Sequence, residues 1–214
     1  EYRKLFIPGK DRVQVGSDAS GLELRCLGHY LAPFDGGKFA KEVVEGDIHT
    51  ALAEIYGTDR KSGKGVTYCL IYGGGDHKLG LTAGASKRHA SAKGKEVRAR
   101  IMEGLDGFAE LSKAVQSRAE GDVLKGLDGR PIRLQGKRHA ALNYLLQSAG
   151  AVICKQWLIR VNEMLQEAGI DYTPLAFVHD EVQLSVPPDQ ATMAGQITTL
   201  SMKDVQHATK FRCA

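Results

Sequence analysis

Two short apolar segments near the end of the chain constrain its fold most strongly. Residues 175–178 (LAFV) are apolar, and apolar and polar residues alternate over 182–186 (VQLSV). The turn His179-Asp180-Glu181 separates them and two prolines follow, so the pattern predicts a hairpin that stops at the prolines. Residues 13–17 (VQVGS) predict a similar strand near the other end of the chain. A sheet that joins all three strands needs a long connection.

Helical patterns fill most of that connection. Apolar residues recur at helical spacing, and capping residues and glycines mark the ends of the segments; Asp47, for example, caps the segment 48–56. The predicted helices cover residues 20–32, 48–56, 60–72, 86–119 (two helices, with a break near 104–107), 140–167 and 189–208. Asp128-Gly129 predicts a second hairpin between 122–127 and 130–135. Few strands among many helices define the fold class as α+β.

Composition excludes several classes of protein. The 214 residues are enough to bury a hydrophobic core that needs no disulfides or metal ions to stabilise it. No apolar run reaches the roughly 18 residues of a membrane span, and the first residues lack the pattern of a signal peptide, which indicates a cytoplasmic protein. The net charge of +4 favours polyanionic partners only weakly.

The four cysteines predict neither a metal site nor a disulfide framework. Cys26, Cys69, Cys154 and Cys213 lie at wide, irregular intervals without a C-x-x-C pair. Structural zinc needs clustered Cys and His ligands. We expect reduced thiols in a reducing cytosol.

Two aspartates follow two predicted strands. Asp18 ends the first strand, and Asp180 lies at the turn of the hairpin. If these strands pair in one sheet, the carboxylates converge and repel each other unless a cation lies between them. Oxygen-coordinated Mg²⁺ suits such a pair. The alternative is that both residues are ordinary turn or capping aspartates.

A stripe of cations and aromatic rings follows one predicted helix. Arg60, Lys64, Tyr68 and Tyr72 are spaced by four residues and therefore share one helix face. Such a face can hold a triphosphate and stack on a sugar or base. A solvated charged turn followed by two aromatic rings in the core is the alternative.

These motifs resemble those of a known family. Residues 18–25 (DASGLELR) and 178–181 (VHDE) resemble motifs A and C of family A DNA polymerases, and the stripe ending at Gly73 resembles motif B. Residues 46–50, 125–130, 139–143 and 145–151 add to a likeness that spans nearly the whole chain. The likeness is closest to the replicative polymerases of T7-like, short-tailed phages.

The resemblance implies part of a right-hand polymerase fold, in which a palm with a small antiparallel sheet carries mostly helical fingers. Residues 1–46 would form palm with motif A. Residues 47–125 would form fingers, with the motif B helix at 60–72. Residues 126–214 would complete the palm, with the motif C hairpin at 175–186. The expected activity is template-directed DNA synthesis by two-metal nucleotidyl transfer of dNTPs to a primer 3′-hydroxyl, releasing pyrophosphate.

The resemblance also assigns residue roles. Asp18 and Asp180 would bind two Mg²⁺ ions together with the carbonyl of Ala19, and Glu181 would assist catalysis. The nucleotide-binding residues would be Glu23, His49, Arg60, Lys64, Tyr68 and Tyr72. The residues that contact primer-template DNA would be Arg130, Asn143, Gln147 and His179. Glu23 and the ring of Tyr68 would leave no room for the 2′-hydroxyl of a ribonucleotide.

The sequence leaves three hypotheses open. The first is a fragment or subunit of a DNA polymerase, whose partners would be primer-template DNA, dNTPs, missing thumb and exonuclease portions, or a processivity factor. The others are a non-catalytic nucleic-acid-binding fragment and a relative of single-subunit RNA polymerases. The start at Glu1 and the stop at Ala214 favour a piece of a longer enzyme. If a phage encodes it, the location would be the host cytoplasm. The basic residues 87–100 would follow template phosphates or form a solvated face.

Overall fold

The computed structural model describes residues 2–212 and divides them into two compact units. The sheet unit comprises residues 2–22 and 150–212, and the helical unit comprises residues 23–149. The helices are α1 (Leu22–Asp35), α2 (Lys38–Glu45), α3 (Ile48–Tyr56), α4 (Arg60–Ile71), α5 (Asp76–Thr82), α6 (Ala90–Gly104), α7 (Phe108–Ala119), α8 (Ala141–Glu167) and α9 (Ala191–Thr209). The strands are β1 (Val13–Asp18), β2 (Val123–Lys125), β3 (Pro131–Arg133), β4 (Thr173–Val178) and β5 (Glu181–Val186). The predicted α+β class is confirmed.

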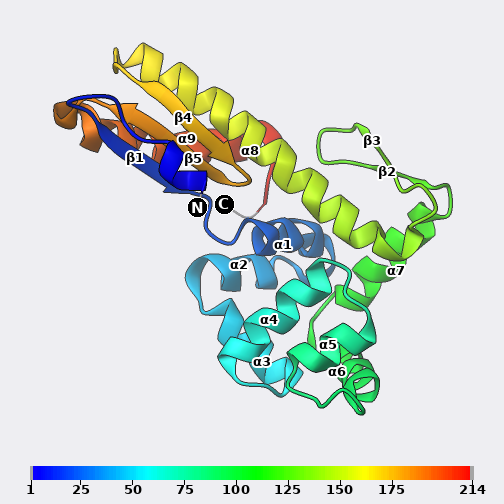
Figure 1. The fold of residues 1–214 in the computed structure, drawn as a ribbon. Coiled ribbons are helices and arrows are strands. Elements are labelled where there is room, and N and C mark those ends of the chain that lie inside the picture. Colours follow the sequence, from blue (N-terminus) through cyan, green and yellow to red (C-terminus); the bar gives the residue numbers. More distant parts are fainter. Residues whose placement is uncertain (1, 213–214) are drawn as a thin grey trace. The chain divides into compact units, whose positions relative to one another are not determined.

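The sheet unit contains a three-stranded antiparallel sheet in the order β1-β5-β4 (Figure 1). The predicted hairpin forms β4 and β5, and the distant first strand pairs with β5 over its whole length. Val182, Leu184 and Val186 of β5 are buried, and α9 packs against β1. The side chains of Asp18 and Glu181 belong to the alternate set of positions, which leaves them on the other face of the sheet.

The single tryptophan joins two helices of the sheet unit. Trp157 of α8 is 2% exposed. Its indole Nε1–H donates to the carbonyl oxygen of Thr198 at 2.8 Å and to Oγ of Ser201 at 3.1 Å, both on α9. The indole therefore buries a large apolar surface and still satisfies its one donor.

Close helix packing in the helical unit accounts for glycines that weaken isolated helices. A Cβ atom at Gly63 of α4 would lie 2.6 Å from Cβ of Ala53 on α3. A Cβ atom at Gly80 of α5 would lie 1.8 Å from the carbonyl oxygen of Ala90 on α6. These glycines let α3 approach α4, and α5 approach α6, more closely than any other residue would allow. Figure 1 shows the resulting group of short helices.

The sequence patterns did not predict two of the helices, and some predicted boundaries differ from those in the structure. The short helices α2 and α5 were not predicted, because α2 directly follows the turn at Gly36-Gly37 and α5 contains a glycine. Asp35 starts α2 by accepting hydrogen bonds from the N–H groups of Gly37 and Phe39. The first basic helix begins at Ala90, four residues later than predicted, and β4 begins earlier, at Thr173.

Cys26, Cys69 and Cys154 are buried thiols, as expected, and Cys213 lies outside the described residues. Among residues 2–212, no helix combines the length and the apolar character needed to cross a membrane.

Candidate active site

The sheet unit places two carboxylates opposite each other at one end of the sheet. Asp18, the last residue of β1, pairs in register with Glu181, the first residue of β5. Asp180 directly precedes this pair, and its carbonyl oxygen accepts a 2.9 Å hydrogen bond from the N–H of Ala19. Like charges directly opposite each other on antiparallel strands destabilise a sheet. This arrangement therefore favours a bound cation.

The backbone around these carboxylates is fixed by contacts on the opposite face of the sheet. The neighbour of Asp18, Ser17, forms a 2.6 Å hydrogen bond with the hydroxyl of Thr198 on α9. Successive side chains of a strand point to opposite faces, so this bond anchors β1 from behind. His179 has a φ of 57°, the left-handed conformation that a tight two-residue turn between β4 and β5 requires.

The helical unit places the predicted stripe on one face of α4. Arg60 and Lys64 are exposed, Tyr68 is half-buried, and Tyr72 is the residue that ends the helix. The rings of Tyr68 and Tyr72 are stacked, with centroids 6.2 Å apart. The opposite side of α4 is buried through Gly63 and Val66. The two cations therefore face solvent. The alternative interpretation placed both aromatic rings in the core, whereas Tyr68 is only half-buried and Tyr72 is exposed.

Asp47 holds one of these cations. Its carboxylate accepts hydrogen bonds from Nε of Arg60 at 2.9 Å and from Nη2 at 3.2 Å. The same carboxylate caps α3 through the N–H and hydroxyl of Thr50. The bond from Arg60, followed by the bond from Thr50, holds the pKa of the Asp47 carboxyl well below its usual value. The cap was predicted from the sequence, but the ion pair was not.

His49 lies beside the stripe, on the first turn of α3. Its ring centroid is 6.5 Å from that of Tyr68. Burial, followed by the positive charges of Lys64 and Arg60, lowers the pKa of the imidazole and favours its neutral form. Nδ1 is buried and has no hydrogen-bond partner among the described residues. The histidine can thus contribute a neutral polar group to an anion site without adding a third positive charge.

Tyr72 lies beside two further residues of the predicted site, Glu23 and Gln147. Its hydroxyl donates a 2.6 Å hydrogen bond to Oε1 of Glu23 on α1, and the side chain of Gln147 on α8 lies beside it. The bond to Glu23, followed by burial, raises the pKa of Tyr72 to about 12. Glu23 is thereby held at a fixed position, although Tyr72 is half exposed.

A hollow of about 340 Å³ lies in the helical unit where α4 ends. It is lined by Gly73 and Gly74 after α4, by Arg98 of α6, and by Asn143 of α8, among others. Arg98 donates to Oδ1 of Asp76 at 2.7 Å and to the carbonyl oxygen of Gly74 at 3.0 Å, which fixes this loop. Asn143 therefore faces a preformed concave surface.

The basic residues of the predicted stretch 87–100 are only partly available for a polyanion. Besides Arg98, Lys93 and Arg100 form ion pairs, both with Glu96, at 3.0 and 2.7 Å. Lys87, Arg88 and Lys95 are exposed and form no ion pair within the part of the chain that the structure describes. These three side chains therefore need not give up an ion pair to bind a phosphate. Arg130, in the turn before β3, pairs with Asp128 at 2.5 Å and is otherwise exposed.

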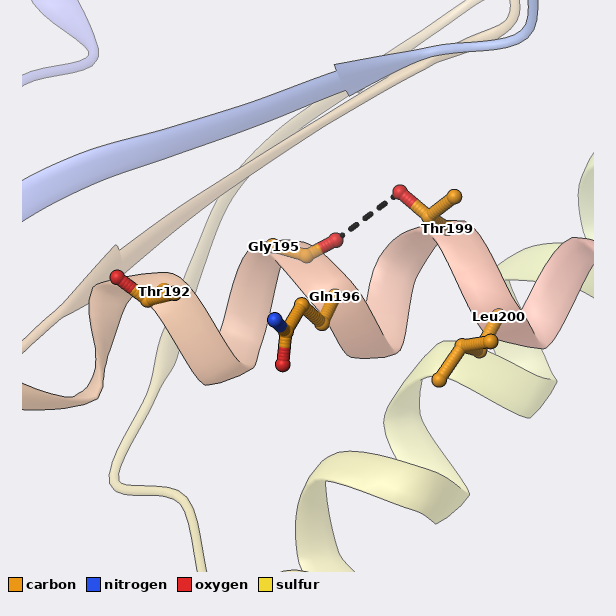
Figure 2. A pocket seen from close by; sticks show the side chains of 5 residues that line it. All are labelled: Thr192, Gly195, Gln196, Thr199 and Leu200. Carbon is orange, nitrogen blue, oxygen red and sulfur yellow. Dashed lines mark hydrogen bonds between the residues drawn. The ribbon is translucent and has the colours of Figure 1, made fainter.

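A further hollow, of about 570 Å³, lies along α9 in the sheet unit (Figure 2). All its lining residues belong to this helix: Thr192, Gly195, Gln196, Thr199 and Leu200. The hydroxyl of Thr199 is already engaged with the carbonyl oxygen of Gly195 at 3.1 Å. The hollow offers no ionisable group, so it does not fit the chemistry that the carboxylates indicate.

Metal-binding groups are sparse in the structure. Within residues 2–212, no three or more His, Cys, Asp or Glu side chains are gathered as a metal-binding group. The oxygen donors of Asp18, Asp180 and Glu181 nevertheless suit Mg²⁺, which takes few protein ligands and completes its shell with water and substrate oxygens.

Comparison with known proteins identifies the family. The model of DNA polymerase family A matches residues 1–213, and the chain belongs to this family. The chain is 40% identical over 97% of its length to a DNA-directed DNA polymerase of Escherichia phage T7, and 39% identical over 97% to one of Enterobacteria phage T3. It spans about a third of the length of both relatives (32%).

A solved structure has the same fold. The chain is similar to the POL domain of Pol1 from M. smegmatis, in a complex with DNA primer-template and dNTP. The TM-score is 0.77 at 21% identity, and the match covers 93% of this chain and 38% of that one. The predicted membership of family A, with a likeness to T7-like phage polymerases, is confirmed.

Proposed function

We propose that the polymerase containing this chain extends a DNA primer along a template, by two-metal transfer of nucleotides from dNTPs to the primer 3′-hydroxyl with release of pyrophosphate. Family membership and the names of the phage relatives support this activity. The observation that carries the proposal is the pairing of Asp18 with Glu181 beside Asp180. A non-catalytic module that binds nucleic acid would gain nothing from carboxylates that repel both DNA and each other.

The carboxylates would hold the metals. We assign two Mg²⁺ ions to Asp18, Asp180 and the carbonyl of Ala19, with Glu181 assisting beside them. When bound, such ions lower the pKa of an attacking hydroxyl and neutralise the charge of the leaving group. The chain itself contributes the position of the ligands: the bond from Ala19 to Asp180 and the anchoring of Ser17 fix the two strand ends relative to each other.

The helical unit would bind the nucleotide. Arg60, Lys64 and neutral His49 would hold the triphosphate, whose negative charges the exposed cations of α4 would offset. Tyr68 and Tyr72 would support the base and sugar. The bond from Tyr72 keeps Glu23 in place, and a fixed carboxylate beside the sugar would exclude a 2′-hydroxyl. This supports DNA synthesis over RNA synthesis.

The remaining predicted residues would contact primer-template DNA. Asn143 and Gln147 lie one turn apart on α8 and would reach base edges, while His179 and Arg130 would contact the backbone. Lys87, Arg88 and Lys95 of the basic stretch are candidates for template phosphates. We assign residues 1–46 and 126–214 to the palm and 47–125 to the fingers. A thumb, an exonuclease portion and a processivity factor would be further partners of the complete enzyme, in the host cytoplasm.

Primer extension by the full gene product that contains this chain tests the proposal. We expect extension with Mg²⁺ and dNTPs, little with rNTPs, and none with Asp180→Ala, which should still bind primer-template DNA. The matched control is Asp189→Ala, an exposed aspartate that follows β5. DNA binding without synthesis would identify a non-catalytic module. Equal use of rNTPs would identify an RNA polymerase, and synthesis by Asp180→Ala near the parent rate would refute the metal assignment.

A further inference from the structure

A row of polar side chains leads along the exposed sheet face to Glu181. Gln183 lies two residues after Glu181 on β5, and therefore on the same face. Its amide nitrogen donates a hydrogen bond to Oε1 of Glu181. The amide oxygen of Gln183 accepts a 2.9 Å hydrogen bond from Nε2 of Gln14 on β1. Because Gln14 donates to the oxygen, the amide of Gln183 is oriented with its nitrogen towards the carboxylate.

Gly16 leaves the space that this amide occupies. It pairs in register with Gln183 across β1 and β5. A Cβ atom at Gly16 would lie 2.5 Å from Nε2, 2.6 Å from Oε1 and 2.9 Å from Cδ of Gln183. Glycine weakens a strand interior and often marks a close approach, and here the group that approaches is the Gln183 amide. Only glycine at position 16 allows the amide to lie across β1 in this orientation.

We propose that Gln183, seated over Gly16, is a positioning residue that holds Glu181 beside Asp18 for divalent-metal binding. The two carboxylates lie directly opposite each other, and without a tether their repulsion would turn the flexible glutamate side chain away. A hydrogen bond from a neutral amide to a carboxylate restrains it without adding charge. This role rests on the proposed function, because it presupposes that Asp18, Asp180 and Glu181 bind a metal.

Mn²⁺ binding, read from the loss of the electron paramagnetic resonance signal of the free ion, tests this role without measuring synthesis. Outer groups that orient metal ligands typically contribute about 10- to 100-fold to affinity, so we expect Gln183→Ala to weaken Mn²⁺ binding by about tenfold. Gln196→Ala, which removes an exposed glutamine of α9, is the matched control and should bind Mn²⁺ like the parent. The baseline is the double variant Asp18→Asn/Asp180→Asn.

Gly16→Ala provides a second, independent route to the same effect. The added methyl group meets the end of a flexible side chain, which can swing away, so the melting temperature should change little while the amide leaves Glu181. We expect Gly16→Ala to weaken Mn²⁺ binding about as much as Gln183→Ala. The double variant Gly16→Ala/Gln183→Ala should bind Mn²⁺ no more weakly than either single variant, because both changes break the same contact.

The outcomes separate this inference from the proposed function. If the parent binds Mn²⁺ no better than the Asp18→Asn/Asp180→Asn baseline, both fail. If the parent binds Mn²⁺ and Gln183→Ala binds it equally well, only the role of Gln183 is refuted. Independent, multiplying losses in the double variant would also refute it. Circular dichroism of each variant verifies that the loss does not come from unfolding.

Discussion

The hydroxyl of Tyr72 donates a 2.6 Å hydrogen bond to Oε1 of Glu23. The two residues are far apart in the sequence, one at the end of α4 and the other in the first turn of α1. The contact explains how a glutamate on a helix surface can keep one orientation: its partner is a rigid ring that also stacks on Tyr68. It also couples the ionisation of the tyrosine to the carboxylate.

This coupling predicts the alkaline titration of Tyr72. The bond stabilises the neutral phenol and raises its pKa to about 12, above the usual value of 10.0. A raised pKa stabilises the fold fully below about pH 10, and this contribution is lost as the pH rises from 10 towards 12. Glu23→Gln removes the charge, so the Tyr72 midpoint should fall towards 10 in NMR spectra of protein labelled with ¹³C-tyrosine.

Tyr56 is the internal control for this titration. Burial is the main reason that its pKa is raised to about 12, and its hydroxyl lies 3.1 Å from that of Thr67, far from Glu23 in the chain. Its midpoint should be unchanged in Glu23→Gln, and Tyr72→Phe assigns the signals. Equal midpoints for Tyr72 in the parent and in Glu23→Gln would show that the carboxylate does not control the phenol.

Local patterns predicted the parts of the site that depend on neighbouring residues. Alternation and the prolines located the hairpin around Asp180, and the four-residue spacing placed Arg60 and Lys64 on one helix face. Asp47 was recognised as a cap because capping involves residues within three positions. Here the physical cause and its signal lie in the same short segment.

Contacts between elements could not be predicted in this way. Two contacts depend on how helices and strands are placed in space. They are the ion pair between Asp47 and Arg60 and the packing of Gln183 over Gly16. The only local signals were a glycine inside a strand and an acidic cap near a basic helix start. The helix α5 was missed because its Gly80 lowers helix propensity, and the close packing on Ala90 that compensates for it is a tertiary effect.

Two glycines on helices should respond to alanine in opposite directions. Gly63→Ala forces a Cβ atom to within 2.6 Å of Cβ and 2.9 Å of Cα of Ala53, so α3 and α4 must separate, at a cost of about 1–3 kcal/mol. At Gly195 of α9 a Cβ atom meets only Cγ1 of Val15, at 3.9 Å. Gly195→Ala should therefore stabilise the protein by about 0.5–1 kcal/mol through helix propensity. Urea unfolding of both variants measures the difference, and the same sign for both would contradict the packing argument.

Trp157 should contribute strongly to the stability of the sheet unit. Trp157→Phe leaves a cavity and removes both hydrogen bonds to α9, so we expect a loss of about 2–4 kcal/mol in the free energy of unfolding. Ser201→Ala removes one of the two acceptors and should cost about 1 kcal/mol. Circular dichroism must follow the unfolding, since the variant lacks the only tryptophan. Equal losses in the two variants would show that packing of the indole contributes little.

The ion pair between Asp47 and Arg60 should compete with a bound triphosphate. Asp47→Asn keeps a good helix cap for α3 but removes the charge that holds the guanidinium, so Arg60 becomes available to phosphate. An exposed pair is weak, and we therefore expect only about two- to fivefold tighter dNTP binding, measured by calorimetry in the presence of primer-template DNA.

Asp59 supplies the matched control for this competition, because it caps α4 through the N–H groups of Lys61 and Ser62, whereas the guanidinium of Arg60 pairs with Asp47. Asp59→Asn should leave dNTP affinity unchanged.

The acid limit of stability should differ as well: the depressed pKa of Asp47 stabilises the fold above its usual value of 3.8, and this contribution is lost as the pH falls below that value. Asp47→Asn should therefore lose less stability than the parent between pH 5 and the acid transition, as measured by urea unfolding at each pH. Weaker dNTP binding in Asp47→Asn would mean that Asp47 presents Arg60 to the triphosphate instead of competing for it.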